Sequence, residues 1–459
     1  MRIRAYGLTI LGVVLIAGAF LAQSPRPDNL PNPEFATPNF SQPVPKPPNV
    51  ELKVPPGFSV SLYADGLPGV RWMQWSPNGD LFVSQYGRST ITVLRDPRNG
   101  GKPVRTVYAN GSGGIRRDGP GDRGDRGGNR RGPNGPPPPG FFAGPADTAA
   151  AAIPCLADAT LTPGTVGIQN PMGMAFRNGF FYVANTDSII RYKYTPGDLE
   201  PQGEPQKIAD LPGGGFHGWR NLIFNRPGTK MYVTVGSASN NRAGEDCRRA
   251  AILELNADGT GMRIFASGLR NPEGLAWQPG TNRLWTAVNE RDSLGDDLVP
   301  DYLTSVRDGG FYGWPYSYIG QHYDPRYVGG QQELVKKAII PDVLIPAHSA
   351  PLGMAFYTGN QFPPRYFNGA FVALHGSWNR SKANGYKVVF VPFVNGMPGP
   401  IEDFLTGFLL KEGGRNPDGS IAPITQWGRP VGVIVARDGS LLITDDQGGR
   451  IWQVRYRNP

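Results

Sequence analysis

A short phrase of sequence recurs six times along this chain and limits the folds that the chain can adopt. Each copy contains a short apolar run, a turn, and a second run rich in β-branched and aromatic residues. Two such runs around a turn predict a β-hairpin. The first runs lie at 73–75, 173–176, 221–224, 274–277, 353–356 and 432–435, and the second runs at 80–84, 181–185, 231–235, 283–287, 370–374 and 440–444.

The repeats predict an all-β fold, a six-bladed β-propeller, with an open solenoid as the alternative. Their spacing is near the ~40–45 residues of a propeller blade, with longer gaps where loops are inserted. A ring of repeats buries apolar faces between neighbours and exposes only short sheet edges. The 63 glycines and 47 prolines fit many short strands joined by tight turns. The run at 58–63 is expected to supply an outer strand that helps to close the ring.

The chain divides into three parts. Residues 1–22 contain Arg2 and Arg4, an apolar run and small residues suited to cleavage, which predicts a secretory signal peptide. A membrane anchor is the alternative, but the apolar run is short for a span. Residues 23–54 are expected to form a disordered or extended arm, and 55–459 the propeller, with a Gly-, Pro- and Arg-rich inserted loop at about 110–145. We therefore expect a periplasmic or secreted protein without a stable membrane span.

The formal net charge of +9 does not by itself indicate nucleic-acid binding. A good part of the excess lies between 116 and 131, where arginine alternates with Gly, Asp and Pro as in a solvated loop, and no recognition helix or stacking motif stands beside it. Cys155 and Cys247 could form one disulfide in an exported protein, or remain two thiols. A thiolate metal site is not expected, because neither cysteine has Cys-x-x-Cys spacing.

Propellers carry functional groups on loops at one mouth of the channel, so residues just before the repeats are candidates. His217 lies among glycines before the third repeat, where an accessible imidazole can act as a general base. Arg270 and Asn271 precede the fourth repeat, where a guanidinium can hold a planar ligand that bears carbonyl and carboxylate oxygens. Structural roles remain alternatives for all three residues.

The turn at 288–297 concentrates carboxylates, Glu290 and Asp292 among them, with turn carbonyls. Oxygen ligands of this kind suit calcium, although the EF-hand spacing is absent and acidic turns are often only solvated. Two more histidines, His348 and His375, lie in loops at the fifth repeat. Three of the four histidines thus flank repeats, which favours a shared functional role.

Five strings of sequence resemble the PQQ-dependent soluble sugar dehydrogenases, the glucose/sorbosone dehydrogenase-like family, in its sorbosone dehydrogenase branch. They are GLRNP at 268–272, NERDSLGDD at 289–297, DGGFYGWPY at 308–316, HSAPLG at 348–353 and LHGSWNR at 374–380. The resemblance runs from about residue 49 to the C-terminus, apart from the inserted loop. It implies a quinoprotein that holds pyrroloquinoline quinone (PQQ) and calcium at the propeller mouth. Such an enzyme oxidises an aldose or a sorbosone-like aldehyde by hydride transfer to PQQ.

The resemblance implies roles for particular residues. His217 matches the base that removes the substrate proton. Arg270 and Asn271 match the pair that holds the quinone oxygens, where Arg270 would stabilise the charge that develops during reduction. Asn170, together with Gln169, matches the polar group near the base.

The resemblance also implies the metal ligands and the remaining cofactor contacts. The backbone around Asp292 and Ser293 matches the calcium-binding turn, with Glu290 as a further ligand, although the family's Gly-Pro is replaced here. Arg429 matches a contact to a cofactor carboxylate, but the second arginine of the family's Arg-x-Arg-Asp element is absent. The family's cofactor-binding lysine has no clear counterpart, and Arg380 is its candidate replacement. These departures concern cofactor affinity and substrate choice more than fold.

Two other functions compete with the dehydrogenase. One is a non-catalytic carbohydrate- or partner-binding propeller, which the altered cofactor contacts would suit, and the other is a calcium-dependent propeller lactonase. The expected partners of the enzyme are a small sugar and an external electron acceptor, such as a periplasmic cytochrome or a quinone. The chain has no Cys-x-x-Cys-His motif for haem attachment. A monomer and a homodimer both remain open.

Overall fold

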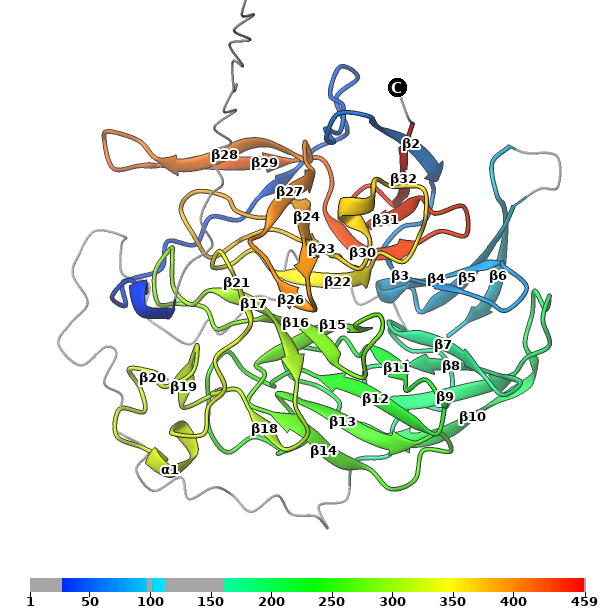
Figure 1. Cartoon of the computed structure of the whole chain (residues 1–459), viewed down its shortest axis with the longest axis horizontal. Coiled ribbons are helices and arrows are strands. Elements are labelled where there is room, and N and C mark those ends of the chain that lie inside the picture. Colours follow the sequence, from blue (N-terminus) through cyan, green and yellow to red (C-terminus); the bar gives the residue numbers. More distant parts are fainter. Residues whose placement is uncertain (1–26, 97–100, 112–160, 458–459) are drawn as a thin grey trace, which may run out of the picture.

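The computed structural model describes residues 27–96, 101–111 and 161–457 (Figure 1). The expected signal peptide, nearly all of the expected inserted loop, and Cys155 lie outside the described residues. Strands dominate, and helices within the described ranges are limited to α1 (Gln332–Val335) and the 3-10 turns η1 (Pro27–Asn29), η2 (Tyr86–Arg88) and η3 (Pro364–Tyr366). None of these helices is long and apolar enough to cross a membrane. The fold is all-β, as the sequence predicts.

Six sheets in the described part of the chain contain four or five strands each. The first three are β3 (Val70–Trp75), β4 (Leu81–Gln85), β5 (Thr90–Arg95), β6 (Val104–Asn110); β7 (Met174–Arg177), β8 (Phe180–Ala184), β9 (Ser188–Lys193), β10 (Gln202–Asp210); and β11 (Leu222–Phe224), β12 (Lys230–Val235), β13 (Ala251–Asn256), β14 (Arg263–Ser267) with β18 (Gly310–Phe311).

The other three large sheets are β15 (Asn271–Trp277), β16 (Leu284–Asn289), β17 (Asp301–Val306), β21 (Val343–Ile345); β22 (Pro351–Phe356), β23 (Ala370–Leu374), β24 (Lys387–Val391), β27 (Glu402–Leu405); and β30 (Pro430–Val435), β31 (Leu441–Asp445), β32 (Arg450–Tyr456), β2 (Phe58–Ala64). Smaller pairs are β19 (Ser317–Tyr318) with β20 (His322–Tyr323), and β25 (Phe393–Val394) with β26 (Met397–Pro398).

The six repeated phrases form the first two strands of the six large sheets. In each sheet these strands pair antiparallel, for example Met174 with Val183 and Leu275 with Thr286. The second strands β4, β23 and β31 are buried along their whole length. Burial on both faces explains why their sequences are almost continuously apolar, because each sheet is packed between two others.

Glycines of the repeated phrase allow neighbouring sheets to approach closely at their first strands. A Cβ added at any of four such glycines would lie 2.4 to 2.6 Å from a backbone atom of the next sheet. These glycines are Gly173, Gly274, Gly353 and Gly432. The first strands contact one another in the order β3, β7, β11, β15, β22, β30 and β3 again. Side chains longer than hydrogen are therefore excluded at these contacts.

The N-terminal segment joins the two ends of the described chain. β2 pairs with β32 from Phe58↔Tyr456 to Ala64↔Ile451, so the expected outer strand at 58–63 is confirmed as the edge of the last sheet. The preceding arm is extended and crosses the molecule (Figure 1). Within it, β1 (Gln42–Pro43) pairs with β29 (Ile421–Gln426) of the hairpin that β29 forms with β28 (Leu409–Arg415).

Candidate functional site

The loop that carries His217 leads into β11 and is held by two buried arginines. Arg220 is fully buried and donates from Nη1 to the carbonyls of His217 (2.7 Å) and Trp219 (2.8 Å). Arg249 donates from Nη2 to the carbonyls of Gly213 (2.5 Å) and Gly214 (2.9 Å). A glycine-rich segment has little rigidity of its own, so these contacts fix its shape.

The imidazole of His217 has one defined tautomer. Its Nδ1 lies 2.9 Å from the carbonyl oxygen of Ser237 and 3.0 Å from the hydroxyl of the same residue. Because a carbonyl oxygen can only accept, Nδ1 carries the proton, and Nε2 of the neutral ring has the lone pair. Burial, and then the charge of Arg270, lower the pKa of His217 to about 3. The ring is therefore neutral at physiological pH and able to accept a proton at Nε2.

Arg270, at the start of β15, is buried against the acidic turn. Its guanidinium donates to the carbonyls of Asn240 (3.0 Å) and Glu290 (2.7 Å), and to the side chains of Asn240 (3.0 Å) and Asp292 (3.2 Å). Asn271 lies beside the base, because a Cβ on Gly236 would touch both Asn271 Oδ1 and the His217 ring. The structure thus brings together His217, Arg270 and Asn271, as the sequence predicts for the mouth loops.

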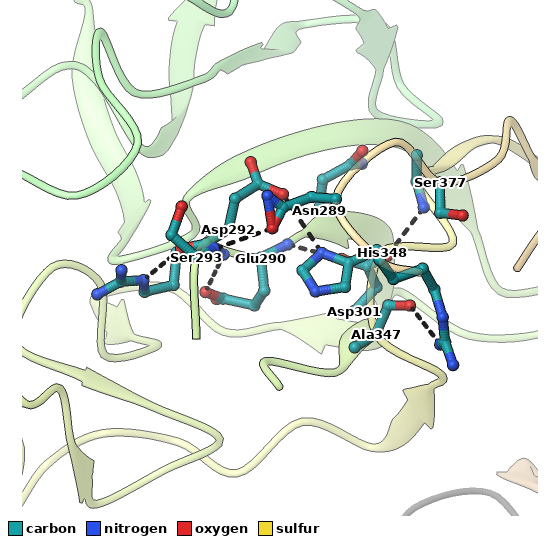
Figure 2. A network of polar contacts seen from close by, with 12 residues as sticks. Asn289, Glu290, Asp292, Ser293, Asp301, Ala347, His348 and Ser377 are labelled. Atoms are coloured by element: carbon teal, nitrogen blue, oxygen red, sulfur yellow. Dashed lines mark hydrogen bonds and ion pairs between the residues drawn. The ribbon is translucent and has the colours of Figure 1, made fainter. Parts of the chain in front are cut away.

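Asp292 contacts both Arg270 and His348, and we call these three residues the Asp292 cluster. Figure 2 labels Asp292 and His348. Asp292 Oδ1 lies 3.3 Å from His348 Nδ1, while His348 Nε2 lies 2.9 Å from the carbonyl of Gly295. Burial opposes a charge on this imidazole, but the hydrogen bond and charge of Asp292 raise the pKa of His348 above its usual value. Both ring nitrogens face acceptors, which fits an imidazolium.

Two further carboxyl groups, one of them in the turn itself, are buried at this site. Asp301 accepts hydrogen bonds from the backbone amides of Glu290 (2.8 Å) and Ala350 (2.9 Å) and so ties the turn to the His348 loop. Burial raises the pKa of Asp301 to about 7 and that of Glu290 to about 8. Glu290 Oε1 has no hydrogen-bond partner within the described ranges. These groups are held in a dry interior rather than in a solvated acidic turn.

The predicted metal ligands are close together, but two of them already have protein partners. The carboxylate of Asp292 contacts Arg270 and His348, and its carbonyl accepts from Asn240 Nδ2 (3.1 Å). Ser293 has a φ of 74° and donates from its amide to the side chain of Asn379 (3.2 Å). No group of three or more His, Cys, Asp or Glu side chains in the described part of the chain could hold a metal ion.

A second group of charges, the Asp446 cluster, follows β31. Asp446 accepts from Arg71 (3.0 Å), from Arg429 (3.1 and 3.2 Å) and lies 3.2 Å from His375 Nε2. Burial alone would raise the pKa of Asp446, but Arg429 and Arg71 lower it well below its usual value. Burial and the charge of Arg429 lower the pKa of His375 to about 4. Trp219 connects this cluster to the His217 loop, since Arg71 lies 4.2 Å from the centre of its ring.

The remaining predicted cofactor residues have other contacts. Arg380 Nη2 lies 3.0 Å from Asp297, and its Nη1 reaches the carbonyl of Ala347 at 3.5 Å. In the loop before β7, the Gln169 side chain lies 2.6 Å from the Thr165 hydroxyl, and the backbone amide of Asn170 donates to the Ser89 hydroxyl (3.1 Å). The roles of these residues stay predictions.

Sequence reasoning missed three residues that organise these clusters. Asn240 bridges Arg270 and Asp292, and Arg71 and Asp446 form the core of the second cluster. Asn240 lies in an irregular segment without a motif. Arg71 lies in β3, two residues before the predicted run at 73–75, and Asp446 lies beside Asp445. A charged residue next to a predicted buried strand is the signal that could have found Arg71. Separately, Cys247 is disulfide-bonded.

Comparisons with known proteins agree with this arrangement. The model of the family "Glucose / Sorbosone dehydrogenase" matches residues 206–377, and a model described as TrAA12-like matches 330–457. An uncharacterised protein from Borreliella burgdorferi is 30% identical over 303 residues, which are 63% of this chain and 76% of that protein.

Two fungal proteins extend the comparison. A PQQ-dependent pyranose dehydrogenase from Coprinopsis cinerea is 34% identical over 127 residues, 26% of this chain and 16% of the enzyme. The solved structure of its PQQ domain in the holo form has a TM-score of 0.65 and 19% identity, and covers 91% of this chain and 100% of that chain. A calcium structure of a Trichoderma reesei family AA12 enzyme has a TM-score of 0.63 and 19% identity, with 91% and 99% covered.

The structural likeness establishes a β-propeller fold, and the family model covers the His217 loop, Arg270, the Asp292 turn and His348. The sorbosone branch is not resolved by these matches. The family model over residues 206–377 and the shared fold both make this chain similar to the glucose/sorbosone dehydrogenase family.

Proposed function

We propose that this protein is a PQQ-dependent dehydrogenase that oxidises the anomeric hydroxyl or aldehyde hydrate of a sugar. One observation carries the proposal, namely the neutral imidazole of His217, whose Nδ1 proton is held by the Ser237 carbonyl. Nε2 is thereby prepared to accept the hydroxyl proton of a substrate. The pyranose dehydrogenase among the relatives supports sugar as the substrate class.

The residues around His217 fit a planar polyanion such as PQQ, which carries three carboxyl groups. In the Asp446 cluster two arginines face one carboxylate, and Arg71 Nε and Nη1 have no hydrogen-bond partner among the described residues. A buried guanidinium with unused donors is suited to an anion. Asn271 Oδ1 also has no partner within the described chain, but as an acceptor it suits an N–H or O–H group of a ligand rather than an anion. The cofactor would therefore be held by Arg71, Arg429 and Asn271.

When bound, PQQ supplies a quinone carbonyl that accepts a hydride. His217 takes the substrate proton at Nε2, and the Arg270 charge favours negative charge developing nearby. The charge of Arg270 is the second cause of the low pKa of His217. An anion beside this guanidinium would offset that effect and raise the pKa toward the range where a base works well.

Calcium is proposed at the turn that contains Glu290, Asp292 and Ser293. The buried and unpartnered Glu290 Oε1 supports this place, and the calcium-bound fungal structure supports the ion. Asp292 contributes less as a ligand, because its carboxylate contacts Arg270 and His348. Backbone carbonyls of the turn and oxygens of the cofactor would complete the coordination.

The finer features of the proposal rest on the fold and the sequence. Six large sheets whose first strands contact one another in cyclic order support six blades in a closed ring. The sorbosone branch and export through residues 1–22 are inferred from sequence motifs alone, and an external electron acceptor is proposed only on the ground of that export.

Dye reduction by the purified protein with a panel of aldoses, with and without PQQ and calcium, tests the proposal. We expect activity to require PQQ and calcium, and to fall by about 10² to 10⁴ in His217→Ala, the usual contribution of a general base. His322→Ala is the matched control, because His322 is exposed on a remote strand. Absence of both activity and calorimetric PQQ binding would overturn the dehydrogenase and favour a sugar-binding or lactonase propeller.

A further inference from the structure

We propose that Glu245 is a positioning residue for the base His217. The inference rests on the proposed function, since it assigns how this chain orients that base. Glu245 lies in the irregular segment between β12 and β13 and does not itself contact the imidazole. It acts on the three residues 237–239, which form the surface against which the His217 loop packs.

The carboxylate of Glu245 holds residues 238 and 239 through two hydrogen bonds. Its Oε2 accepts from the backbone amide of Ala238 (2.6 Å), and its Oε1 accepts from the hydroxyl of Ser239. Hydrogen bonds to a charged acceptor are stronger than those between neutral groups. Residues 237–239 lie outside the strands, so no strand pairing fixes their backbone. The two hydrogen bonds to the Glu245 carboxylate therefore help to hold it in place.

On its other side, the same segment orients the base loop. The Ala238 carbonyl accepts from the amide of Phe216 (3.0 Å), and the Ser237 carbonyl accepts from His217 Nδ1 (2.9 Å). The Ser237 amide donates to the carbonyl of Arg270 (2.8 Å), which places the segment between the base and the predicted quinone clamp. A shift of this segment would therefore move both the ring and its tautomer-setting acceptor.

Arg249, four residues further along the chain, completes the support. It donates to the carbonyls of Gly213 and Gly214 at one end of the base loop, and to that of Gly236 (3.3 Å), which precedes the 237–239 segment. A single segment thus supports both the backbone that accepts from His217 and the glycines that precede His217. Glu245 holds the former and Arg249 the latter. Neither the sequence motifs nor the family strings include Glu245.

The role differs from a metal or cofactor contact, because each carboxylate oxygen already accepts a hydrogen bond from the protein, one from a backbone amide and one from a hydroxyl. A Gln side chain keeps one carbonyl acceptor for the Ala238 amide and can donate to the Ser239 hydroxyl. A Leu side chain of similar size offers neither contact. The pair Glu245→Gln and Glu245→Leu therefore separates the hydrogen bonds from the volume of the side chain.

The experiment measures ¹⁵N chemical shifts of the imidazoles, with and without PQQ, together with kcat and calorimetric PQQ affinity. The chain has four histidines, and the signals lost in His217→Ala identify those of the base. We expect the Nδ1–H tautomer in the wild-type protein and in E245Q, but a mixture of tautomers in E245L. We expect kcat to fall about tenfold to a hundredfold in E245L, as for a misplaced catalytic group, with PQQ affinity within about threefold. Glu333→Leu, an exposed substitution in α1, is the control.

A single wild-type-like tautomer in E245L would overturn the positioning role, as would equal losses of kcat in E245Q and E245L. The tautomer measurement needs no substrate. If wild-type protein has the Nδ1–H tautomer and E245L does not, but no sugar is oxidised, the positioning inference stands and the proposed function fails. If sugar is oxidised and E245L keeps both tautomer and rate, only the positioning inference fails.

Discussion

The Asp292 and Asp446 clusters use similar residues to opposite effect. Each contains a buried aspartate that contacts a histidine and at least one arginine. In the Asp292 cluster the pKa of the histidine is raised, whereas in the Asp446 cluster it is lowered to about 4. A contact between histidine and aspartate therefore does not by itself determine the charge of the imidazole.

The difference arises from how many cations share the aspartate. Arg270 spreads its donors over Asn240, Glu290 and Asp292, and His348 has the Gly295 carbonyl as a second acceptor. We call the Asp292 cluster closed, because the donors of Arg270 and His348 are matched by acceptors of the protein.

We call the Asp446 cluster open, because some of its donors have no acceptor among the described residues. Two arginines and His375 converge on the single carboxylate of Asp446, so the imidazole is kept neutral and Arg71 retains unused donors. A closed cluster can hold a turn in shape, and an open cluster can receive an anion.

The largest expected effect compares the two aspartates directly. Asp446→Asn leaves Arg71 and Arg429 without a counter-charge and should lower the free energy of unfolding by about 3–5 kcal/mol, the cost of breaking a buried ion pair. Asp292→Asn should cost less, because Arg270 keeps its carbonyl acceptors and His348 can lose its proton. Urea unfolding at pH 7 measures both, and a larger loss in Asp292→Asn would contradict the distinction between closed and open clusters.

A pH series sharpens the comparison at His375. Its folded pKa of about 4 is below the ordinary histidine value of ~6.5, so the unfolded state binds more protons between these pH values. Stability should therefore fall as the pH drops from 6.5 to 4, and by roughly 3 kcal/mol for this residue. In His375→Gln this part of the slope should disappear from denaturant curves. A slope equal to that of the wild-type protein would show that His375 is not held neutral.

The smallest expected effect concerns the unused donors of Arg71. Arg71→Leu should weaken calorimetric PQQ binding by about 1.5–3 kcal/mol, the usual value of a hydrogen bond to a charged group. The exposed Arg455, paired with Asp438, provides the control substitution Arg455→Leu. Unchanged affinity in Arg71→Leu would mean that the Asp446 cluster is a structural element and not an anion site.

Much of the fold could be predicted from sequence because strand pairing within a sheet is local. Each repeated phrase contains both strands of a hairpin, and the glycines within it mark contacts between neighbouring sheets. The pairing of β2 with β32 was also predictable, since an apolar run before the first repeat had no partner of its own. The extended path of the arm, by contrast, depends on contacts with residues far along the chain, such as Glu34 with Leu294 and Asn39 with Trp378.

The sequence by itself predicted His217, Arg270, Asn271 and Asp292 as candidate site residues, because motif residues and turn chemistry are properties of short segments. Only the tertiary structure decided their states. It showed that Asp292 contacts Arg270 and His348, that Arg71 reaches Asp446, and that Ser237 sets the tautomer of His217. Charge and tautomer depend on burial and on partners from distant segments, and no local pattern of sequence encodes those distances.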